Sequence, residues 1–401
     1  MKKTLVLIAM SFYISVFSLY AVDFGLVFNQ NAEIDVPAFN FENTGFKISG
    51  ILLPRFTALI GETTDLYISA AISYEAGPFA VIPELTRTDI DFNLGYADIK
   101  FGRMFYSDPL GIIANNLFDG AQLSIFTRGG NFRFGGWYTG CLYKKRAEIT
   151  MTPDELKSSF VEVDYNDFSN TYFAPSRVLA ALEYDHPSLA GFVSVKTSIL
   201  AQFDTRDEKL NSQYLTAALS VSGKSVYFDL GGCFELIEYN DEIIPAFAAD
   251  IGLTFILPTK LEQHITLSGR YSSGVSEDKT IGAFLPLTTV EQGELLEAKL
   301  SGLSLLSLDF AGRLAESLSA NMAFTYFIRN DLGTYRYYPV ISGGSEGFFL
   351  GGEIFGRLIW NISTGIRLNF GTGVFLPMIG DAAPDAGILW RTKLNLTISI
   401  F

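Results

Sequence analysis

Histidine is scarce in this chain of 401 residues, which contains only two. His186 stands before Pro187 in a turn-like segment, and His264 begins a strand-like segment. A catalytic histidine has to lie beside a nucleophile or an acid and be oriented by a third group, and neither histidine has such neighbours in the sequence. No residues with zinc-ligand spacing and no glycine-rich phosphate loop leading into a helix occur. We therefore expect no enzymatic activity, no cofactor and no bound metal ion.

Cysteine is equally scarce, and the two residues of this type are Cys141 and Cys233. Both fall in strand-like segments that lie well apart in the expected strand order. A disulfide requires Cα atoms within roughly 7 Å of each other, which this separation disfavours. We expect two free thiols.

Basic residues are outnumbered, with 29 lysines and arginines against 43 aspartates and glutamates and a formal net charge of -14 at pH 7. Nucleic-acid binding rests largely on contacts from lysine and arginine to phosphate, so nucleic acid is excluded as a partner. An acidic chain is also repelled by anionic lipid headgroups unless its negative charge lies in loops away from them.

Long apolar runs are missing everywhere except at the N-terminus. Residues 1–21 have a basic start at Lys2 and Lys3, an apolar run from residue 5 to residue 17, and a small residue at Ala21. This order is typical of a secretory signal peptide, so we expect cleavage after Ala21 and an exported chain of residues 22–401. The alternative is an uncleaved anchor helix, although the run is somewhat short for one.

The apolar residues of the exported part are dispersed rather than absent, since 48% of the sequence is hydrophobic. Residues 348–401 show the pattern best, because Leu394, Leu396 and Ile398 alternate with polar residues such as Lys393 and Asn395. Side chains alternate between the two faces of a strand, so one face here is apolar and the other polar. Only helices and closed barrels satisfy every backbone polar group in a bilayer. The sequence therefore predicts an all-β fold, a transmembrane antiparallel β-barrel.

Turn signals divide the chain into about 18 strands joined alternately by short and long connections. Single-chain bacterial outer-membrane barrels have an even number of strands, with short turns on one side and long loops on the other. We expect an integral protein of the bacterial outer membrane that contacts membrane lipid and the outer-membrane assembly machinery, which would read the aromatic end at Phe401. Sixteen strands is the alternative, if the N-terminal segment is a plug or a linker. The long acidic loop at 144–174 is expected on the extracellular side.

Residues 99–125 contain a strand that ends in Gly102 and Arg103, a loop at 107–117, and a second strand entered at Asp119 and Gly120. This stretch resembles outer-membrane porins and alginate-export-like barrels, in which a strand ending in Gly-Arg feeds a loop that folds into the pore. The C-terminal pattern of Gly352-Glu353 followed by Gly373-x-Phe375-x-Pro377 is a second, short similarity to that group. The resemblance implies a porin-like barrel whose 107–117 loop constricts the pore.

On such a loop, Asp108 and Asp119 would face basic wall residues and create a transverse field that orients polar solutes. The alternative is that Asp108 is a turn residue before Pro109 and that Asp119 belongs to an Asp-Gly turn. The phase of the alternation places charged side chains on the polar face throughout the barrel. The candidate pore-lining residues are Arg103, Asp108, Asp119, Arg133, Glu353, Arg357, Arg367, Arg391 and Lys393.

Basic residues gather in the last three strands. A tight turn at 361–363 would place Arg357 directly opposite Arg367, and Arg391 and Lys393 follow on the last strand. Such a wall favours anionic solutes, unless Glu353 and other acids of the lumen neutralise it.

These features favour a channel for the diffusion of small hydrophilic, potentially anionic solutes. One alternative is a transporter of hydrophobic solutes such as long-chain fatty acids, plugged by residues 23–43. The other is a surface adhesin on a barrel scaffold, with the 144–174 loop as its working part. An oligomer is compatible with the sequence, but no strand is identified as a contact face.

Overall fold

The computed structural model describes residues 19–38, 41–76, 80–206, 209–275, 281–332, 347–383 and 385–400. The expected signal peptide falls almost wholly outside these residues, and so does the terminal Phe401. Within the described part of the chain, no helix is long and apolar enough to cross a membrane.

The strands dominate the chain and are joined by a few short helices. In order, the first half comprises β1 (Leu19–Pro37), η1 (Phe41–Asn43), β2 (Gly45–Ile60), β3 (Thr64–Ala76), β4 (Ala80–Asn93), β5 (Ala97–Ser107), β6 (Asn115–Thr127), β7 (Gly130–Tyr138), α2 (Lys144–Ala147), α3 (Pro153–Ser159), η2 (Tyr165–Asp167), α4 (Phe168–Thr171), β8 (Arg177–Leu189) and β9 (Val193–Asp204). The second half comprises β10 (Leu210–Ser222), β11 (Val226–Tyr239), β12 (Glu242–Ile256), β13 (His264–Ser272), β14 (Glu291–Gln292), β15 (Ala298–Lys299), β16 (Leu303–Ala315), β17 (Leu318–Arg329), β18 (Phe349–Ser363), β19 (Ile366–Leu376), η3 (Pro377–Ile379) and β20 (Leu389–Ile400).

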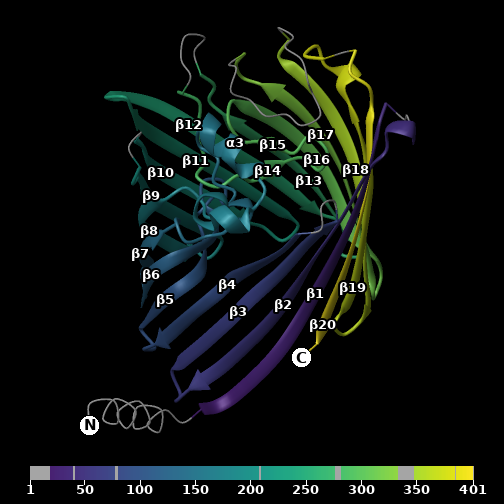
Figure 1. The fold of residues 1–401 in the computed structure, drawn as a ribbon. Helices are drawn as coiled ribbons and strands as arrows, with labels where there is room; N and C mark the ends of the chain where they lie inside the picture. Colours follow the sequence, from purple (N-terminus) through teal and green to yellow (C-terminus); the bar gives the residue numbers. More distant parts are fainter. Residues whose placement is uncertain are drawn as a thin grey trace, which may run out of the picture.

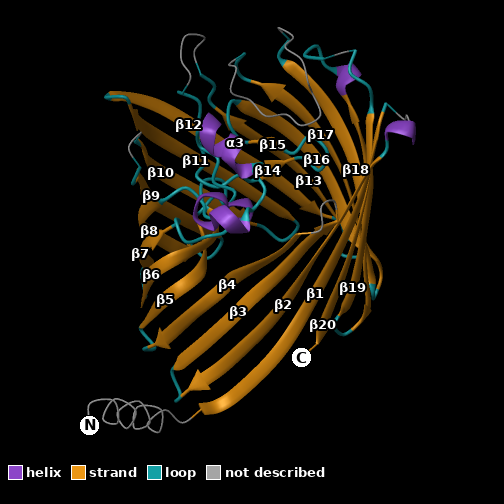
Figure 2. Ribbon diagram, in the orientation of Figure 1, coloured by secondary structure: helices purple, strands orange, loops and turns teal. Residues whose placement is uncertain are grey.

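Eighteen of these strands form one closed antiparallel barrel, shown in Figures 1 and 2. Each strand pairs with its neighbours in the sequence, and β1 closes the ring by pairing with β20 as well as with β2. The short strands β14 and β15 pair only with each other. The prediction of an 18-stranded transmembrane barrel is therefore confirmed, and the N-terminal segment is a strand of the wall.

The barrel wall is apolar outside and polar inside, which inverts the arrangement of a soluble protein. On β11, Leu230 and Phe234 are 47% and 46% exposed, whereas the side chain of Glu235 is fully buried in the interior. Charged side chains facing lipid at the midplane cost roughly 2–4 kcal/mol, whereas apolar ones there are favourable. The alternation seen in the sequence thus specifies which face of each strand meets the bilayer.

Connections are short at one end of the barrel and long at the other. Residues 61–63, 94–96 and 316–317 are examples of the short turns, which lie with the start of β1 and the end of β20 at the lower end of Figure 1. The connection between β7 and β8 and the described part of the connection between β13 and β16 fold into the barrel instead of standing above it (Figure 2). We call residues 139–176 the helical insert and residues 281–302 the crossbar.

Two local predictions were wrong. Cys141 lies in a turn beyond the end of β7 and not in a strand, although both cysteines are free as expected. The second error concerns the register of β18 and β19.

The hairpin of β18 and β19 turns at residues 364–365, later than expected, and carries an irregularity between Asn361 and Ser363. Arg367 therefore pairs with Asn361, and Arg357 pairs with Gly371. The expected contact between the two arginines does not form, because β18 continues past residue 361 instead of turning there.

Candidate pore constriction

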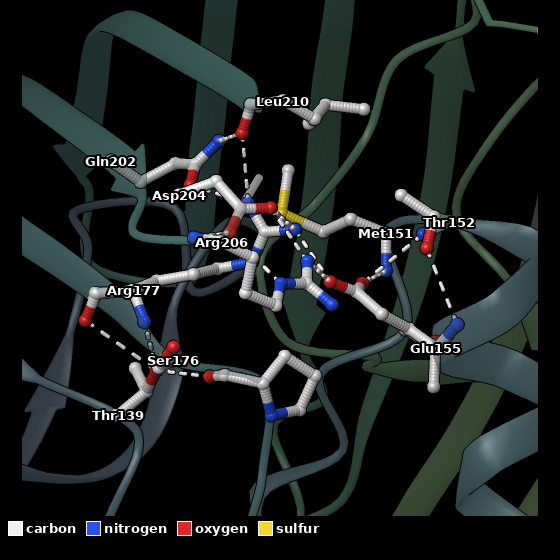
Figure 3. Close-up of polar contacts among 12 residues, drawn as sticks. Thr139, Met151, Thr152, Glu155, Ser176, Arg177, Gln202, Asp204, Arg206 and Leu210 are labelled. Carbon is white, nitrogen blue, oxygen red and sulfur yellow. Dashed lines mark hydrogen bonds and ion pairs between the residues drawn. The ribbon is translucent and has the colours of Figure 1, made fainter. Parts of the chain in front are cut away.

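The helical insert is held to the barrel wall by a buried network of charges, drawn in Figure 3. The Arg177 guanidinium at the start of β8 donates to Glu155 Oε1 at 2.5 Å and lies 3.1 Å from Asp204 Oδ2. Arg206 also pairs with both carboxylates. The side chains of Arg177, Glu155 and Asp204 are almost completely excluded from solvent. Because buried charges are costly when unpaired, this network fixes the insert to β8 and β9.

Glu155 has a second role at the N-terminus of α3. Its Oε2 accepts the backbone N–H of Met151 at 2.6 Å and of Thr152 at 3.1 Å, and the Thr152 hydroxyl accepts the Glu155 N–H. This is a capping box, which satisfies backbone donors that a helix leaves free at its start. The same carboxylate therefore caps the start of α3 and anchors the helix to the wall.

The other side of the helical insert contacts β4. Arg146 Nε donates to Glu84 Oε2 at 2.5 Å, and the Tyr172 hydroxyl donates to the Pro83 carbonyl at 2.9 Å. Tyr143 and Tyr172 stack with ring centroids 4.9 Å apart. The insert thus reaches from β8 to β4 and fills that side of the lumen.

The crossbar spans the lumen between two apolar clusters. Its first part packs Phe284, Leu285 and Leu287 into a cluster that includes residues of β10, β11 and β12. Its later part packs Leu295 and Leu296 into a second cluster with residues of β17, β18 and β19. These two clusters are held by different strands of the wall, so the crossbar divides the interior.

Two carboxylates of the wall hold the backbone of the crossbar at its ends. Glu235 accepts the N–H of Leu285 at 2.8 Å. Glu353 accepts the N–H of Glu294 at 2.7 Å, and those of Leu295 and Leu296 at 3.0 and 3.2 Å. Buried backbone N–H groups are costly when unpaired, so these hydrogen bonds keep both parts of the crossbar in place.

The helical insert and the crossbar meet in the middle of the barrel. Ile149 and Thr288 form an antiparallel bridge, and the N–H of Thr289 donates to the Glu148 carbonyl at 2.9 Å. The hydroxyls of Thr150 and Thr289 are 2.9 Å apart. The two segments therefore form one continuous partition.

A charged cluster ties the crossbar to the junction of the first and last strands. Arg391 on β20 donates to Asp35 on β1 at 2.5 Å and also pairs with Glu297 of the crossbar. Lys393 lies 3.2 Å from Glu297 and 3.5 Å from Glu294. We call these five residues the seam cluster.

The space left beside the partition is a cavity of about 1070 Å³ along β1, β2 and β20. Half of its 22 lining residues are charged, and both signs are represented. The charged lining residues are Asp35, Lys47, Glu75, Lys144, Lys145, Glu148, Glu162, Glu291, Glu297, Lys299 and Arg391. A wet cavity with this lining suits polar solutes, so we take it as the candidate pore constriction.

Most of these charges are already paired with protein groups. Lys145, for example, lies 2.9 Å from Glu162 and 3.7 Å from Glu75. Among the described residues, no ion pair reaches the carboxylates of Glu148 and Glu291, and the Lys144 ammonium has no hydrogen-bond partner. The cavity lining thus contains two exposed carboxylates without an ion pair and one buried ammonium without a hydrogen-bond partner.

Burial and like charge perturb these three groups. Glu148 is exposed to the cavity, and partial desolvation together with neighbouring Glu291 raises its pKa to about 7. Burial also raises the pKa of Glu291, and it lowers that of Lys144. Titratable groups perturbed by desolvation and by a named neighbour are typical of functional sites.

Several of the residues predicted to line the pore are engaged in the wall. Arg103 makes a double contact with Asp119, with both distances at 2.7 Å, and also donates to the Cys141 carbonyl at 2.9 Å. Asp108 is buried and accepts the N–H groups of Leu110, Ile113 and Ala114 at 2.8–2.9 Å. Asp108 thus has the geometry of a turn residue, and Asp119 pairs with a residue of its own hairpin instead of facing across the lumen.

The 107–117 segment forms the end of β5, a compact turn and the start of β6. Ile112 and Ile113 in this turn join the apolar cluster beneath the partition. The Ile113 carbonyl accepts the Thr288 N–H at 3.0 Å. The segment therefore packs against the partition. Within the described part of the chain, it contributes no residue to the lining of the cavity.

The remaining predicted residues behave in different ways. Arg133 pairs with Glu183 at 2.8 Å, and Arg357 pairs with Glu294 at 2.5 Å. Arg367 donates to Asn361 at 3.0 Å near the short-turn end of the barrel. Arg391 lines the cavity, and its partner on β20, Lys393, belongs to the seam cluster. The structure thus brings together Arg357, Arg391 and Lys393 through crossbar acids.

Sequence reasoning missed the crossbar acids and the three unpaired groups of the cavity. Two signals could have found them. The Thr152-Pro153-Asp154-Glu155 sequence matches a capping box and marks a helix within the 144–174 loop. The apolar pair Leu295-Leu296 follows a polar loop and indicates a segment that is buried against the wall.

No protein-family model matches the sequence. No curated protein matches it either. Solved structures of outer-membrane channels from Pseudomonas aeruginosa do match across nearly the whole barrel.

Three of these structures illustrate the similarity. OccK2 (OpdF) in complex with glucuronate has a TM-score of 0.67 at 11% identity, over 95% of this chain and 98% of that chain. OpdK with vanillate has a TM-score of 0.63 at 9% identity, over 95% and 99%. OccK11 (OpdR) has a TM-score of 0.61 at 12% identity, over 95% and 96%. At these identities the similarity establishes a shared barrel fold.

Proposed function

We propose that this protein is an integral channel of the bacterial outer membrane through which small hydrophilic solutes diffuse. The observation that carries the proposal is the charged cavity beside the partition of an 18-stranded barrel. A barrel of this size is wide enough for an aqueous pore, and the partition narrows it to the scale of a small molecule. No catalytic role is part of the proposal.

The similar structures support this choice of solute class. OccK2 was crystallised with glucuronate and OpdK with vanillate, and both ligands are small polar carboxylates. Half of the residues that line the cavity are charged, which disfavours the alternative of a long-chain fatty acid as the solute. The 144–174 segment is largely built into the lumen, so it is a poorer candidate for the working part of an adhesin.

The preference for anions that the basic wall predicts has to be weighed against the acids that pair with it. Glu294, Glu297 and Asp35 are within 4 Å of Arg357, Arg391 or Lys393. Much of the positive charge is therefore compensated, and we expect only modest anion selectivity. The candidate selectivity residues are Arg357, Arg391 and Lys393, with Arg367 further toward the short turns.

The test is the conductance of the refolded protein in a planar bilayer, combined with liposome swelling in sugars. We expect discrete single-channel steps and swelling rates that fall with sugar size. The reversal potential in a salt gradient measures ion selectivity in the same bilayer. Absence of current together with tight binding of a fluorescent fatty acid would contradict the proposal.

A further inference from the structure

Lys144 and Glu148 are four residues apart, at the start and just after the end of α2, yet they do not form an ion pair. This spacing normally brings a lysine and a glutamate together on one helix face. Here Glu148 has a left-handed backbone conformation, with φ of 53°, so its side chain leaves the direction that the helix would give it. Glu148 is the C-cap of α2, where a left-handed residue commonly ends a helix, and its N–H donates to the Lys144 carbonyl at 3.1 Å.

The left-handed end of α2 turns Glu148 away from Lys144, and neither charge has an ion-pair partner among the described residues. Lys144 is 4% exposed, lines the cavity, and its ammonium has no hydrogen-bond partner among the described residues. Glu148 lines the same cavity, and Glu291 of the crossbar lies near enough to raise its pKa. Lys144 is the buried charge of the three, and because a buried charge without a partner is costly, a carboxylate bound beside it would remove that cost.

The unpaired groups are one ammonium, on Lys144, and two carboxylates, on Glu148 and Glu291, so a solute that pairs with all of them must carry both signs of charge. We propose that the cavity is a binding site for small dipolar solutes that carry a cationic amine and a carboxylate, with the amine at Glu148 and Glu291 and the carboxylate at Lys144. The inference rests on the proposed channel function and specifies the solute class. A monovalent anion would satisfy Lys144 only, and it would be repelled by the two carboxylates.

Other charges of the cavity do not compete for the solute, because they are paired within the protein. Arg391 is held by Asp35 and Glu297, and Lys145 is held by Glu162. Lys299 donates to the Thr150 carbonyl. The specificity of the site therefore depends on a few residues that can be changed one at a time.

Equilibrium dialysis of the refolded protein at about pH 8, where Glu148 is ionised, tests the inference without requiring a conducting pore. The probes are γ-aminobutyrate, butyrate and butylamine, which share a chain of carbon atoms and differ in charge. We expect γ-aminobutyrate to bind at least about 10-fold more tightly than either of the others. Equal or tighter binding of butyrate would overturn the inference.

Substitutions assign the two ends of the solute. Lys144→Gln and Glu148→Gln should each weaken γ-aminobutyrate binding by about 10-fold, and Lys144→Arg should retain most of it. Glu148→Gln should at the same time improve butyrate binding, because a repulsive charge is removed. The matched controls are Lys157→Gln and Asp154→Asn, which change exposed residues of α3 away from the cavity lining and should leave binding unchanged.

The two proposals fail in different ways. A protein that conducts ions but does not prefer γ-aminobutyrate overturns the dipolar site and leaves the channel intact. A protein that binds γ-aminobutyrate as described but gives no current overturns the channel and leaves the site intact. If Glu148→Gln and Asp154→Asn weaken binding equally, the effect is not local to the cavity and the assignment of Glu148 is wrong.

Discussion

The helical insert and the crossbar fill the same lumen but are held there by different interactions. The insert depends on the buried ion pairs around Arg177, whereas the crossbar depends on backbone hydrogen bonds to Glu353 and Glu235 and on apolar packing. A buried ion pair is strongly destabilising when one partner is lost, because the other charge stays buried. Apolar packing and backbone hydrogen bonds share their contribution among many groups. The insert is therefore the part that a single substitution can release.

The largest effect is expected from Arg177→Met, which removes the central guanidinium of the network. Glu155 and Asp204 would retain Arg206 only, and we expect a loss of about 3–5 kcal/mol in the free energy that holds the insert. Limited proteolysis of the refolded protein should then cut within residues 139–176, and the mean conductance should rise. Lys157→Gln on α3 is the control. If Arg177→Met is as resistant to protease as the control, the ion pairs do not anchor the insert.

A smaller effect is expected from Glu353→Gln. The amide oxygen can still accept a hydrogen bond, but the charge that strengthens the three contacts is lost, at a cost of about 1–3 kcal/mol. The crossbar should loosen at its later end only. The measurement is the rate of thiol labelling of Leu296→Cys in a Cys141→Ser background, which should increase when Glu353 is changed.

Leu285→Cys at the other end of the crossbar provides the comparison for that measurement. Its labelling rate should not change with Glu353→Gln, since Glu235 holds that end. Equal acceleration at both ends would mean that the crossbar moves as one body.

The smallest effect is the response of ion selectivity to pH. The pKa of Glu148 is raised to about 7, so this carboxyl is mostly neutral below pH 7 and mostly ionised above it. It faces Glu291 on the crossbar and Arg146 on its own helix, and Lys144 and Lys299 line the same cavity. Raising the pH through 7 adds one negative charge, so the cation-to-anion permeability ratio should rise by a few-fold. Reversal potentials measured from about pH 5 to 9 test this, and Glu148→Gln should abolish the change.

The wall of the barrel was predictable from the sequence because its physical cause is local. The alternation in residues 366–376 and 389–400 corresponds closely to β19 and β20, since a strand between lipid and water needs one apolar and one polar face. The register of β18 and β19 was not predictable in the same way, because an irregularity near Asn361 shifts the turn and pairs Arg357 with Gly371 instead of Arg367.

The constriction was far less predictable. The helical insert and the crossbar have no period of two, and their positions depend on contacts between residues far apart in the sequence. Glu155 and Arg177, for example, meet only after the insert has folded back onto β8, and Glu353 meets Leu295 only across the lumen. The positive φ of Glu148 belongs to the end of α2, and a glutamate there is not the glycine or asparagine that usually marks such a helix end in a sequence.

The seam cluster has a consequence for how the barrel is assembled. Asp35 belongs to the first strand of the wall and Arg391 to the last, and Glu297 of the crossbar binds the same arginine. The pairing of β1 with β20 and the placement of the crossbar in the lumen therefore both depend on Arg391. By thermodynamic linkage, each of the two favours the other. A chain whose crossbar is misplaced should pair β1 with β20 less readily. Closure of the barrel in the membrane is thereby coupled to the correct folding of the segments inside it.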